Sequence, residues 1–312
     1  MSENIQLHGP INPYPNITEL IEQDVRNISE KLMRDFHIIR AYNSIYTFKC
    51  LFDGNPAVAK YFVNEEDRRE ILNYRVLTQY SIPTVKTFVL GKATIVMEDV
   101  TKSDVWRLGK PYDVNDVDVS KVLAEWYFTL HERGSAVLEL DSLYFEYDSI
   151  TEEALNILIE KLPNAKELFN FILSHYSKLR ELIFKPSFTL TYNDFNYTNF
   201  AVRRDKKAAM MFDYNLLGKG YRFSDFRNVC WPMDNEARKV FISEYRRLYI
   251  EKHGHYRADE EKVEENIDDV VSHIFTLYVA YTKRDHFPDW ARDSEREAIN
   301  GNLLAKTKLL LL

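Results

Sequence analysis

The spacing of apolar residues in the first hundred positions predicts one helix followed by a strand-rich region. Residues 17–34 carry an apolar stripe at helical spacing, with Thr18 placed to cap the first turn. A second helix is predicted over 64–80, and the sequence DGNP at 53–56 predicts a hairpin turn. Runs typical of β-strands fill the rest of this region: 37–42, 44–52, 56–63, 84–90 and 93–97.

Beyond Met97 the pattern changes to helical periodicity. A polar, mixed segment comes first, and apolar stripes then predict helices at 119–132, 153–162 and 167–184. We therefore expect an α+β protein with two lobes and a cleft between them. The expected parts are a small β-rich N-terminal lobe (1–97), a hinge (98–103) and a larger helical C-terminal lobe (104–312).

Composition and charge narrow the choice of function. The 312 residues are 45% hydrophobic and carry a net charge of −7, which disfavours nucleic acid as a partner. Cys50 and Cys230 are the only cysteines, so a disulfide framework or a cysteine-based zinc site is excluded, and a cytoplasmic protein is expected. We see no signal-peptide pattern and no apolar run long enough for a bilayer, so we expect no membrane partner.

The segment SFTLTYNDFNYTNFAV at 187–202 is the most informative for chemistry. Apolar residues flank a polar loop in which Asp194 and Asn199 lie five positions apart, and Asp213 follows the next apolar run. Phosphoryl transfer needs a carboxylate to take the proton of the acceptor hydroxyl, and oxygen ligands to hold Mg²⁺ against the phosphates. Asp194 suits the first role, while Asn199 and Asp213 suit the second. Taken alone, the D-x-x-x-x-N spacing is common by chance, and a loop aspartate often only caps a turn.

The N-terminal region supplies a second, independent set of groups. Lys60 lies within an apolar strand, and Glu70 lies ten residues later on the following helix. A strand lysine paired with a helix glutamate is how protein kinases hold the α- and β-phosphates. Either residue alone is better explained as a solvated surface charge, but the combination with the Asp194 segment favours a kinase. The glycine-rich phosphate loop G-x-x-x-x-G-K-[ST] is absent.

The order of these elements resembles the aminoglycoside phosphotransferase and choline kinase-like family, whose members are small-molecule kinases with a protein-kinase-like fold. The strand pair AYNSIYTF at 41–48 is similar to the family's nucleotide loop, and TIVMEDV at 94–100 is similar to its hinge strand. Glu70 lies thirteen residues before Pro83, as in the family. Further similarities are a helix that ends in LH at His131, Tyr214 after the metal aspartate, and Asp225 at the start of a later helix.

This resemblance implies a protein-kinase-like two-lobe fold and an ATP- or GTP-dependent O-phosphotransferase that uses Mg²⁺. Lys60, positioned by an ion pair with Glu70, would bind the α- and β-phosphates. The purine would lie against the backbone of the hinge, from Glu98 to Val100. Backbone N–H groups near Asn43 and Ser44 would contact phosphate.

Two departures from the family pattern keep an alternative open. Tyr192 stands where the family mostly has a histidine that braces the catalytic loop, and no G-x-G-x-x-G is present. A nucleotide-binding pseudokinase or regulatory module is therefore the second hypothesis.

The acceptor is expected to be a small hydroxylated molecule, and a cationic, aminoglycoside-like acceptor is favoured over a choline- or sugar-type metabolite. The stretch 258–269 holds seven acids against one lysine and could bind amines, although a solvated helix face is the better explanation. Asp285, Asp289 and Trp290 are alternative acceptor contacts. The sequence leaves the acceptor, the choice between ATP and GTP, and the oligomeric state open.

Overall fold

A computed structural model of the protein describes residues 16–312, which form two compact units. The first unit takes in the chain up to Leu108 together with Ala201–Arg204 and Met210–Asn215. The second takes in Gly109–Phe200, Asp205–Ala209 and Leu216–Leu312. The first is built on a β-sheet and the second is predominantly helical, so the expected α+β class is confirmed. The division into lobes at residues 98–103 stays a prediction.

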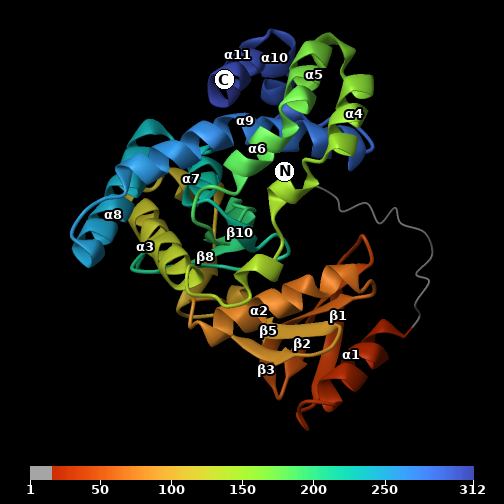
Figure 1. The fold of residues 1–312 in the computed structure, drawn as a ribbon. Coiled ribbons are helices and arrows are strands. Elements are labelled where there is room, and N and C mark those ends of the chain that lie inside the picture. Colours follow the sequence, from red (N-terminus) through yellow and green to blue (C-terminus); the bar gives the residue numbers. More distant parts are fainter. Residues whose placement is uncertain (1–15) are drawn as a thin grey trace. The chain divides into compact units, whose positions relative to one another are not determined.

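A five-stranded antiparallel sheet forms the first unit, with the strand order β1-β2-β3-β5-β4 (Figure 1). Its strands are β1 (Met33–Tyr42), β2 (Ile45–Phe52), β3 (Asn55–Phe62), β4 (Thr87–Leu90) and β5 (Thr94–Glu98). Tight turns join the first three strands, and both central residues of each turn have positive φ angles. They are Asn43 (47°) and Ser44 (62°) in the first turn, and Asp53 (52°) and Gly54 (79°) in the second. Such turns match the right-handed twist of the strands that they connect.

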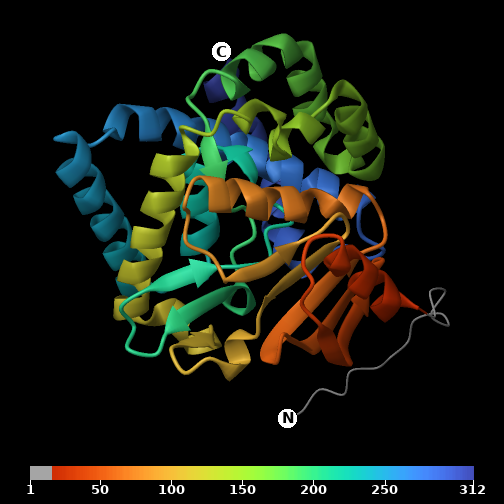
Figure 2. The same cartoon turned by 90° about the horizontal axis from the view of Figure 1, so that it is seen from below.

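The two faces of this sheet are covered differently. Helix α1 (Ile17–Arg26) packs its apolar stripe on one face, against Phe48, Cys50, Ala57 and Ala59 (Figure 2). Because side chains alternate along a strand, Val58 and Lys60 point to the opposite face. Helix α2 (Arg69–Gln79) follows β3 after one 3₁₀ turn, η1 (Glu66–Arg68).

Two helices differ in extent from their predictions. The helix predicted over 17–34 is wrong beyond Arg26, where α1 ends; Ile28 and Leu32 of the predicted stripe are 54% and 59% exposed. Met33 instead begins β1 and is buried in the core beneath α1. The helix predicted over 167–184 is two helices, α5 (Lys166–Ser174) and α6 (Tyr176–Ile183), separated by His175 in a non-helical conformation.

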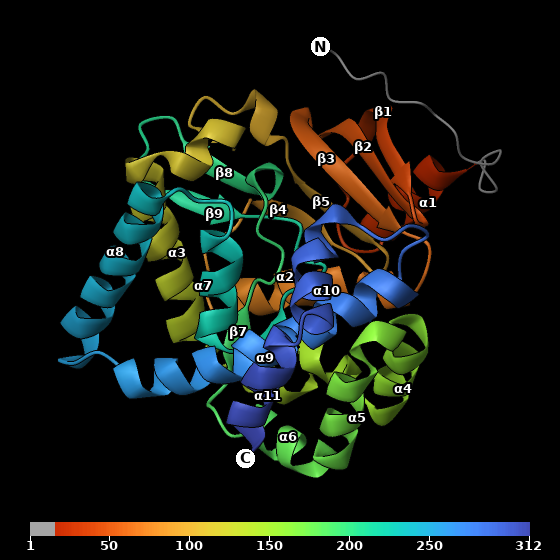
Figure 3. The same ribbon diagram turned by 90° about the horizontal axis from the view of Figure 1, so that it is seen from above.

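Long helices form the second unit (Figure 3). They are α3 (Val117–Gly134), α8 (Asn235–His253) and α9 (Ala258–Thr282), with the shorter α4 (Glu152–Lys161), α5, α6, α7 (Arg222–Cys230), α10 (Arg292–Ile299) and α11 (Asn302–Leu311). A two-stranded ribbon of β7 (Thr189–Thr191) and β10 (Gly218–Gly220) lies among them. The strands β6 (Trp106–Leu108), β8 (Phe200–Arg203) and β9 (Ala209–Met211), most of whose residues belong to the first unit, form a small three-stranded sheet. Within residues 16–312, no helix is both long and apolar enough to span a membrane.

Candidate active site

Lys60 lies between two carboxylates in the first unit. Its Nζ is 2.5 Å from Oε2 of Glu70 and 2.7 Å from Oδ1 of Asp213. Glu70 comes from the first turn of α2 and is fully buried, whereas the side chain of Asp213 is 26% exposed. The structure therefore brings together three of the predicted site residues, one each from a strand, a helix and a loop.

Buried contacts on α2 hold the backbone around Asp213. Asn73 donates a hydrogen bond of 2.7 Å to the carbonyl oxygen of Tyr214, and Tyr74 packs edge-on against the Tyr214 ring at 4.9 Å. Tyr214 in turn donates to the carbonyl of Met211 at the end of β9. Asp213 itself has a φ angle of 62°, in the left-handed region that most residues avoid. Such local strain persists because the surrounding contacts fix the loop.

Burial dominates the electrostatics of this cluster. It raises the pKa of Glu70 to about 7, against the lowering effect of Lys60. Burial alone would lower the pKa of Lys60, but the charges of Glu70 and Asp213 together raise it above its usual value. The lysine is therefore held in its charged form, and with both carboxylates ionised the cluster carries a net negative charge.

A cavity of about 360 Å³ opens beside Lys60 in the same unit. Val58 of β3 and Met97 of β5 line it with apolar surface, and Glu98 and Val100 of the predicted hinge also line it. The backbone N–H of Val100 has no hydrogen-bond partner among the described residues. Apolar lining together with an unpaired N–H of a lining residue has the features that bind a heteroaromatic base.

Side-chain interactions that the sequence did not indicate hold the segment around Val100 in place. Lys49 of β2 donates to Oγ1 of Thr101 at 2.8 Å and lies 3.1 Å from Oδ2 of Asp99. Oδ1 of Asp99 accepts from the N–H and the hydroxyl of Thr101, at 2.9 Å and 2.6 Å. These bonds orient the peptide groups on either side of Val100.

Asn43 and Ser44 form the exposed tip of the β1–β2 turn. The carbonyl of Ser44 accepts a hydrogen bond of 3.1 Å from the N–H of Val63, just after β3. Neither residue is among those that line the cavity beside Lys60.

The second unit contains the loop with Asp194 and Asn199. The amide nitrogen of Asn199 donates to Oδ2 of Asp194 at 3.1 Å and to its carbonyl oxygen at 3.2 Å. These bonds leave Oδ1 as the side-chain acceptor of Asn199, where Thr198 donates its hydroxyl at 3.1 Å. The D-x-x-x-x-N spacing thus corresponds to a closed loop in which the two side chains are in contact.

Asp225 at the start of α7 anchors the beginning of this loop. Its carboxylate accepts from the N–H groups of Tyr192 and Asn193, at 2.9 Å and 3.0 Å, and lies 3.1 Å from Nε2 of His131. His131 is fully buried, and its Nδ1 lies 2.8 Å from the hydroxyl of Tyr245. Burial lowers the pKa of His131, so the imidazole is neutral at pH 7. Asp225 fitted the sequence pattern, but nothing in the sequence indicated these bonds.

Tyr192 fills the position at which the family mostly has histidine. Its side chain is fully buried, packs edge-on against Trp126 at 5.8 Å and donates to the carbonyl of Asn199 at 3.5 Å. The tyrosine therefore spans the loop from its first residue to Asn199, which is a bracing contact.

Most acids of the stretch 258–269 bind cations of the protein itself. Glu264 lies 2.5 Å from Arg257, and Asp268 lies 2.6 Å from Arg227. Their neighbours Glu260, Glu261 and Glu265 also form ion pairs. Of the alternative acceptor contacts, Asp285, Asp289 and Trp290 are all exposed.

Glu146, in the short 3₁₀ helix η5 (Glu146–Ser149), is a buried acid that the sequence analysis missed. The residue is 8% exposed, and no residue that the structure describes donates a hydrogen bond to its carboxylate or forms an ion pair with it. Burial raises its pKa to about 8, partly opposed by Arg227, and the charge of Asp194 contributes to the rise. No signal in the sequence separates this residue from other glutamates.

In residues 16–312, no three His, Cys, Asp or Glu side chains gather into a group that could hold a metal ion. Any metal bound by Asn199 or Asp213 would therefore need further ligands from a substrate or from water.

The fold is shared with proteins of known structure, among them an ethanolamine kinase and a spectinomycin phosphotransferase. LicA in complex with AMP has a TM-score of 0.59 at 15% identity, over 93% of this chain and 98% of that one. The ethanolamine kinase of Plasmodium vivax has a TM-score of 0.57 at 14% identity, over 88% and 84% of the two chains. Spectinomycin phosphotransferase APH(9)-Ia, in complex with ADP and spectinomycin, has a TM-score of 0.55 at 11% identity, over 94% and 98%.

These similarities define the class of the fold: it is the protein-kinase-like fold of small-molecule phosphotransferases, as the resemblance in sequence implied. No protein-family model matches the sequence, and the search of curated proteins found no match. At these identities the comparison shows the fold, and the function rests on the site.

Proposed function

We propose that the protein is a small-molecule kinase that transfers the γ-phosphate of ATP or GTP to a hydroxyl group. The observation that carries this proposal is the cluster of Lys60, Glu70 and Asp213 at the edge of an apolar cavity. Two carboxylates lie within 2.7 Å of the Lys60 Nζ and the group borders a cavity, so a charged lysine is held where an entering phosphate could reach it. The shared fold supports the same activity.

In this proposal the first unit binds the nucleotide. Lys60 contacts the α- and β-phosphates while Glu70 holds its side chain in place. The purine lies in the cavity beside Val58, with the backbone between Glu98 and Val100 offering hydrogen bonds. Asn43 and Ser44 contribute backbone N–H groups at the phosphate end.

Mg²⁺ fits the donor set of the proposed metal ligands. Asn199 and Asp213 offer an amide oxygen and a carboxylate, the hard ligands that Mg²⁺ prefers. The amide nitrogen of Asn199 is engaged with Asp194, so its oxygen is the atom available to a cation. Bound there, Mg²⁺ would supply positive charge against the phosphates, in a region where Glu70 and Asp213 outweigh Lys60.

Asp194 serves as the base of the reaction. The oxygen of the acceptor hydroxyl bonds to the γ-phosphorus, the bond from that phosphorus to the bridging oxygen breaks, and the nucleoside diphosphate leaves with the electron pair. The proton of the hydroxyl passes to Asp194. The contact with Asn199 keeps the carboxylate of Asp194 in one orientation.

A cationic acceptor is supported by an acidic side chain of the second unit that has no partner among the described residues, Glu146. Most acids of α9 are paired with arginines or lysines, whereas Glu146, which is only 8% exposed, has no such partner within residues 16–312, and its pKa responds to the charge of Asp194. A buried carboxylate is costly unless it is paired. An ammonium group of the acceptor would supply that partner close to the base, so Glu146→Gln is expected to raise KM for a cationic acceptor and leave nucleotide binding unchanged.

The test is transfer of labelled phosphate from ATP and from GTP, with Mg²⁺, to a panel of aminoglycosides, choline, ethanolamine and sugars. Asp194→Asn should lower turnover by about 10²–10⁴-fold. Asp141→Asn, which changes a side chain that is 95% exposed, is the matched control. Nucleotide binding without transfer to any acceptor would favour the regulatory module suggested by Tyr192, and undiminished turnover in Asp194→Asn would refute the base assignment.

A further inference from the structure

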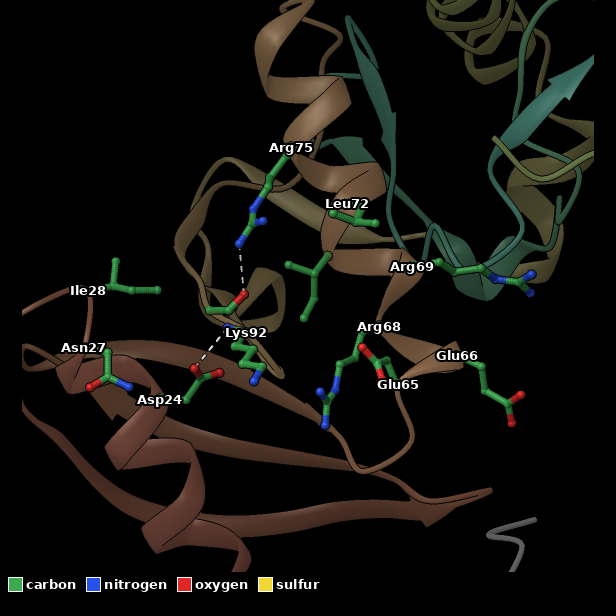
Figure 4. A pocket seen from close by; sticks show the side chains of 12 residues that line it. Asp24, Asn27, Ile28, Glu65, Glu66, Arg68, Arg69, Leu72, Arg75 and Lys92 are labelled. Carbon is green, nitrogen blue, oxygen red and sulfur yellow. Dashed lines mark hydrogen bonds between the residues drawn. The ribbon is translucent and has the colours of Figure 1, made fainter. Parts of the chain in front are cut away.

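A second cavity in the first unit, of about 500 Å³, has no role in the proposed function (Figure 4). Its walls are the C-terminal end of α1, the segment from Glu65 to Arg75 that includes the start of α2, and the β4–β5 turn at Gly91 and Lys92. It shares no lining residue with the cavity beside Lys60. Its volume is in the range of sites that bind small molecules.

Specific bonds hold two of these walls together. Both oxygens of Asp24 on α1 accept backbone N–H groups of the β4–β5 turn, from Lys92 at 2.9 Å and from Ala93 at 2.8 Å. Gly91 permits this approach, because a Cβ atom there would lie 2.3 Å from Oδ2 of Asp24. Both oxygens of Asp24 are thus engaged with the backbone, and this carboxylate forms no ion pair with the cations of the cavity among the described residues.

Three cations of the cavity lack a carboxylate partner. Arg68 donates to the carbonyl oxygens of Phe62 and Val63, at 3.4 Å and 3.1 Å, and Arg75 donates through Nη2 to those of Leu90 and Gly91, at 3.1 Å and 3.0 Å. Within residues 16–312, neither arginine forms an ion pair, and the Lys92 side chain forms neither an ion pair nor a hydrogen bond. A guanidinium carries more N–H groups than these bonds use, so donors remain on both arginines.

The remaining lining gives the cavity an amphiphilic character. Ile71 is buried at its base, and Ile28 and Leu72 are 54% and 56% exposed, although both are large apolar side chains. Figure 4 shows the side chains of Glu66 and Arg69 directed away from Arg75 and Lys92. One wall therefore offers apolar contact and the other offers unpaired positive charge.

The same arginines connect the cavity to the proposed nucleotide site. The carbonyls that accept from Arg68 follow Lys60 on β3 by two and three residues, and Arg68 precedes Glu70 on α2 by two. Arg75 ties α2 to the β4–β5 turn. A ligand that binds both arginines and Lys92 would fix α2, and with it Glu70, against the sheet.

We propose that this cavity is an effector site for a small organic anion, with an apolar body against Ile28 and Leu72 and an acidic head group against Arg75 and Lys92. Occupancy strengthens nucleotide binding, because it holds α2 in the position that pairs Glu70 with Lys60. A carboxylate, sulfonate or phosphate head group would meet the same donors.

Direct binding is tested by calorimetry on the full chain with octanesulfonate as the probe, and with octanol and octylammonium as uncharged and cationic counterparts. Lys92→Gln should weaken octanesulfonate binding by about tenfold, the worth of one charge-assisted hydrogen bond. Arg75→Gln should do the same, and circular dichroism monitors its folding. Lys86→Gln, another exposed lysine of the first unit that lies outside this cavity, is the matched control. The proposal would be overturned if octanesulfonate bound all variants with equal affinity, or if octanol bound as tightly as octanesulfonate. It would also be overturned if a non-hydrolysable ATP analogue abolished octanesulfonate binding.

The coupling between this cavity and the nucleotide site is tested separately by binding measurements, so that failure of the proposed kinase activity does not decide the outcome. Saturating octanesulfonate should lower the Kd of the ATP analogue at least about fivefold, and the analogue should tighten octanesulfonate binding by the same factor. An unchanged Kd would overturn the link to Glu70. A third measurement distinguishes a membrane surface from a small molecule as the ligand. If the protein sediments with anionic vesicles, Lys92→Gln abolishes this, and soluble octanesulfonate does not bind, then the ligand is a membrane surface and the small-molecule assignment is overturned.

Discussion

Replacing Glu70 with glutamine tests the electrostatics of the Lys60 cluster. Burial raises the pKa of Glu70 to about 7, from an ordinary value of 4.5. The native state therefore binds the proton more tightly than the unfolded chain does, and between these two values it carries more protons. Stability must then fall as the pH rises through this window, which is the opposite of the usual behaviour of a salt-bridged carboxylate.

The size of the effect follows from the difference between the two pKa values. At about 1.4 kcal/mol for each tenfold change in proton affinity, it amounts to about 3 kcal/mol. Wild-type protein is expected to lose about this much free energy of unfolding between about pH 5 and pH 8, relative to Glu70→Gln. Lys60 keeps Asp213 as a partner in the variant, so the cluster retains one ion pair.

Urea unfolding at several pH values gives the two profiles. Glu30→Gln, which changes an exposed carboxylate without a described partner, is the matched control and should follow the wild type. Parallel profiles for the wild type and Glu70→Gln would refute the assignment of a raised pKa. The same protonation should weaken binding of an ATP analogue below about pH 7, because an uncharged Glu70 no longer orients Lys60, and this pH dependence should be absent in Glu70→Gln.

Three further substitutions probe the backbone around the two sites. Asp225→Asn should destabilise the second unit by about 3 kcal/mol, because N–H groups at the start of the Asp194 loop lose a charged acceptor; unchanged thermal stability would contradict this. If Asp194 is the base as proposed, the same change should lower kcat more than it changes nucleotide Kd. Ser44→Gly should stabilise the protein by about 1 kcal/mol in urea unfolding, because glycine adopts a φ of 62° without strain, and a loss of stability would speak against the turn. Gly91→Ala should destabilise it by about 1–3 kcal/mol, since the new methyl group would meet Asp24; a neutral effect would show that α1 can move away from the β4–β5 turn.

The sequence predicted the elements whose periodicity is local. The run predicted as a strand at 56–63 corresponds to β3, but only the structure shows that Lys60 points to the face opposite Ala57 and Ala59. The helix predicted over 17–34 was too long, because Ile28 and Leu32 continue the apolar spacing of α1 in the sequence but are exposed in the structure. Tertiary packing decides where α1 ends, because Met33 is buried in the core beneath α1 and the chain must turn after Arg26 to bring it there.

The contacts that build the candidate site could not be predicted, because they join residues far apart in the sequence. Lys60 and Asp213 are separated by 153 positions, and Lys49 meets Thr101 across 52. The sequence proposed roles for Lys60 and Asp213, but it could not show that they are in contact. Glu146 can be recognised only in the structure, where nearby Asp268 is paired with Arg227 and Glu146 has no ion-pair partner among the residues described.

Glu70 and Asp213 both pair with Lys60, but the free-energy cost of losing the lysine differs between them. Glu70 is fully buried on α2, so leaving it without the lysine would leave a carboxylate alone in the core, at a cost of several kcal/mol. Asp213 is 26% exposed, and water can solvate its carboxylate when the lysine moves away. A phosphate group that enters the cavity therefore competes with Asp213 rather than with Glu70. Nucleotide binding should accordingly free Asp213 for another cation while the Lys60–Glu70 pair persists, so Asp213→Asn should leave nucleotide affinity without metal unchanged or stronger, whereas Glu70→Gln should weaken it.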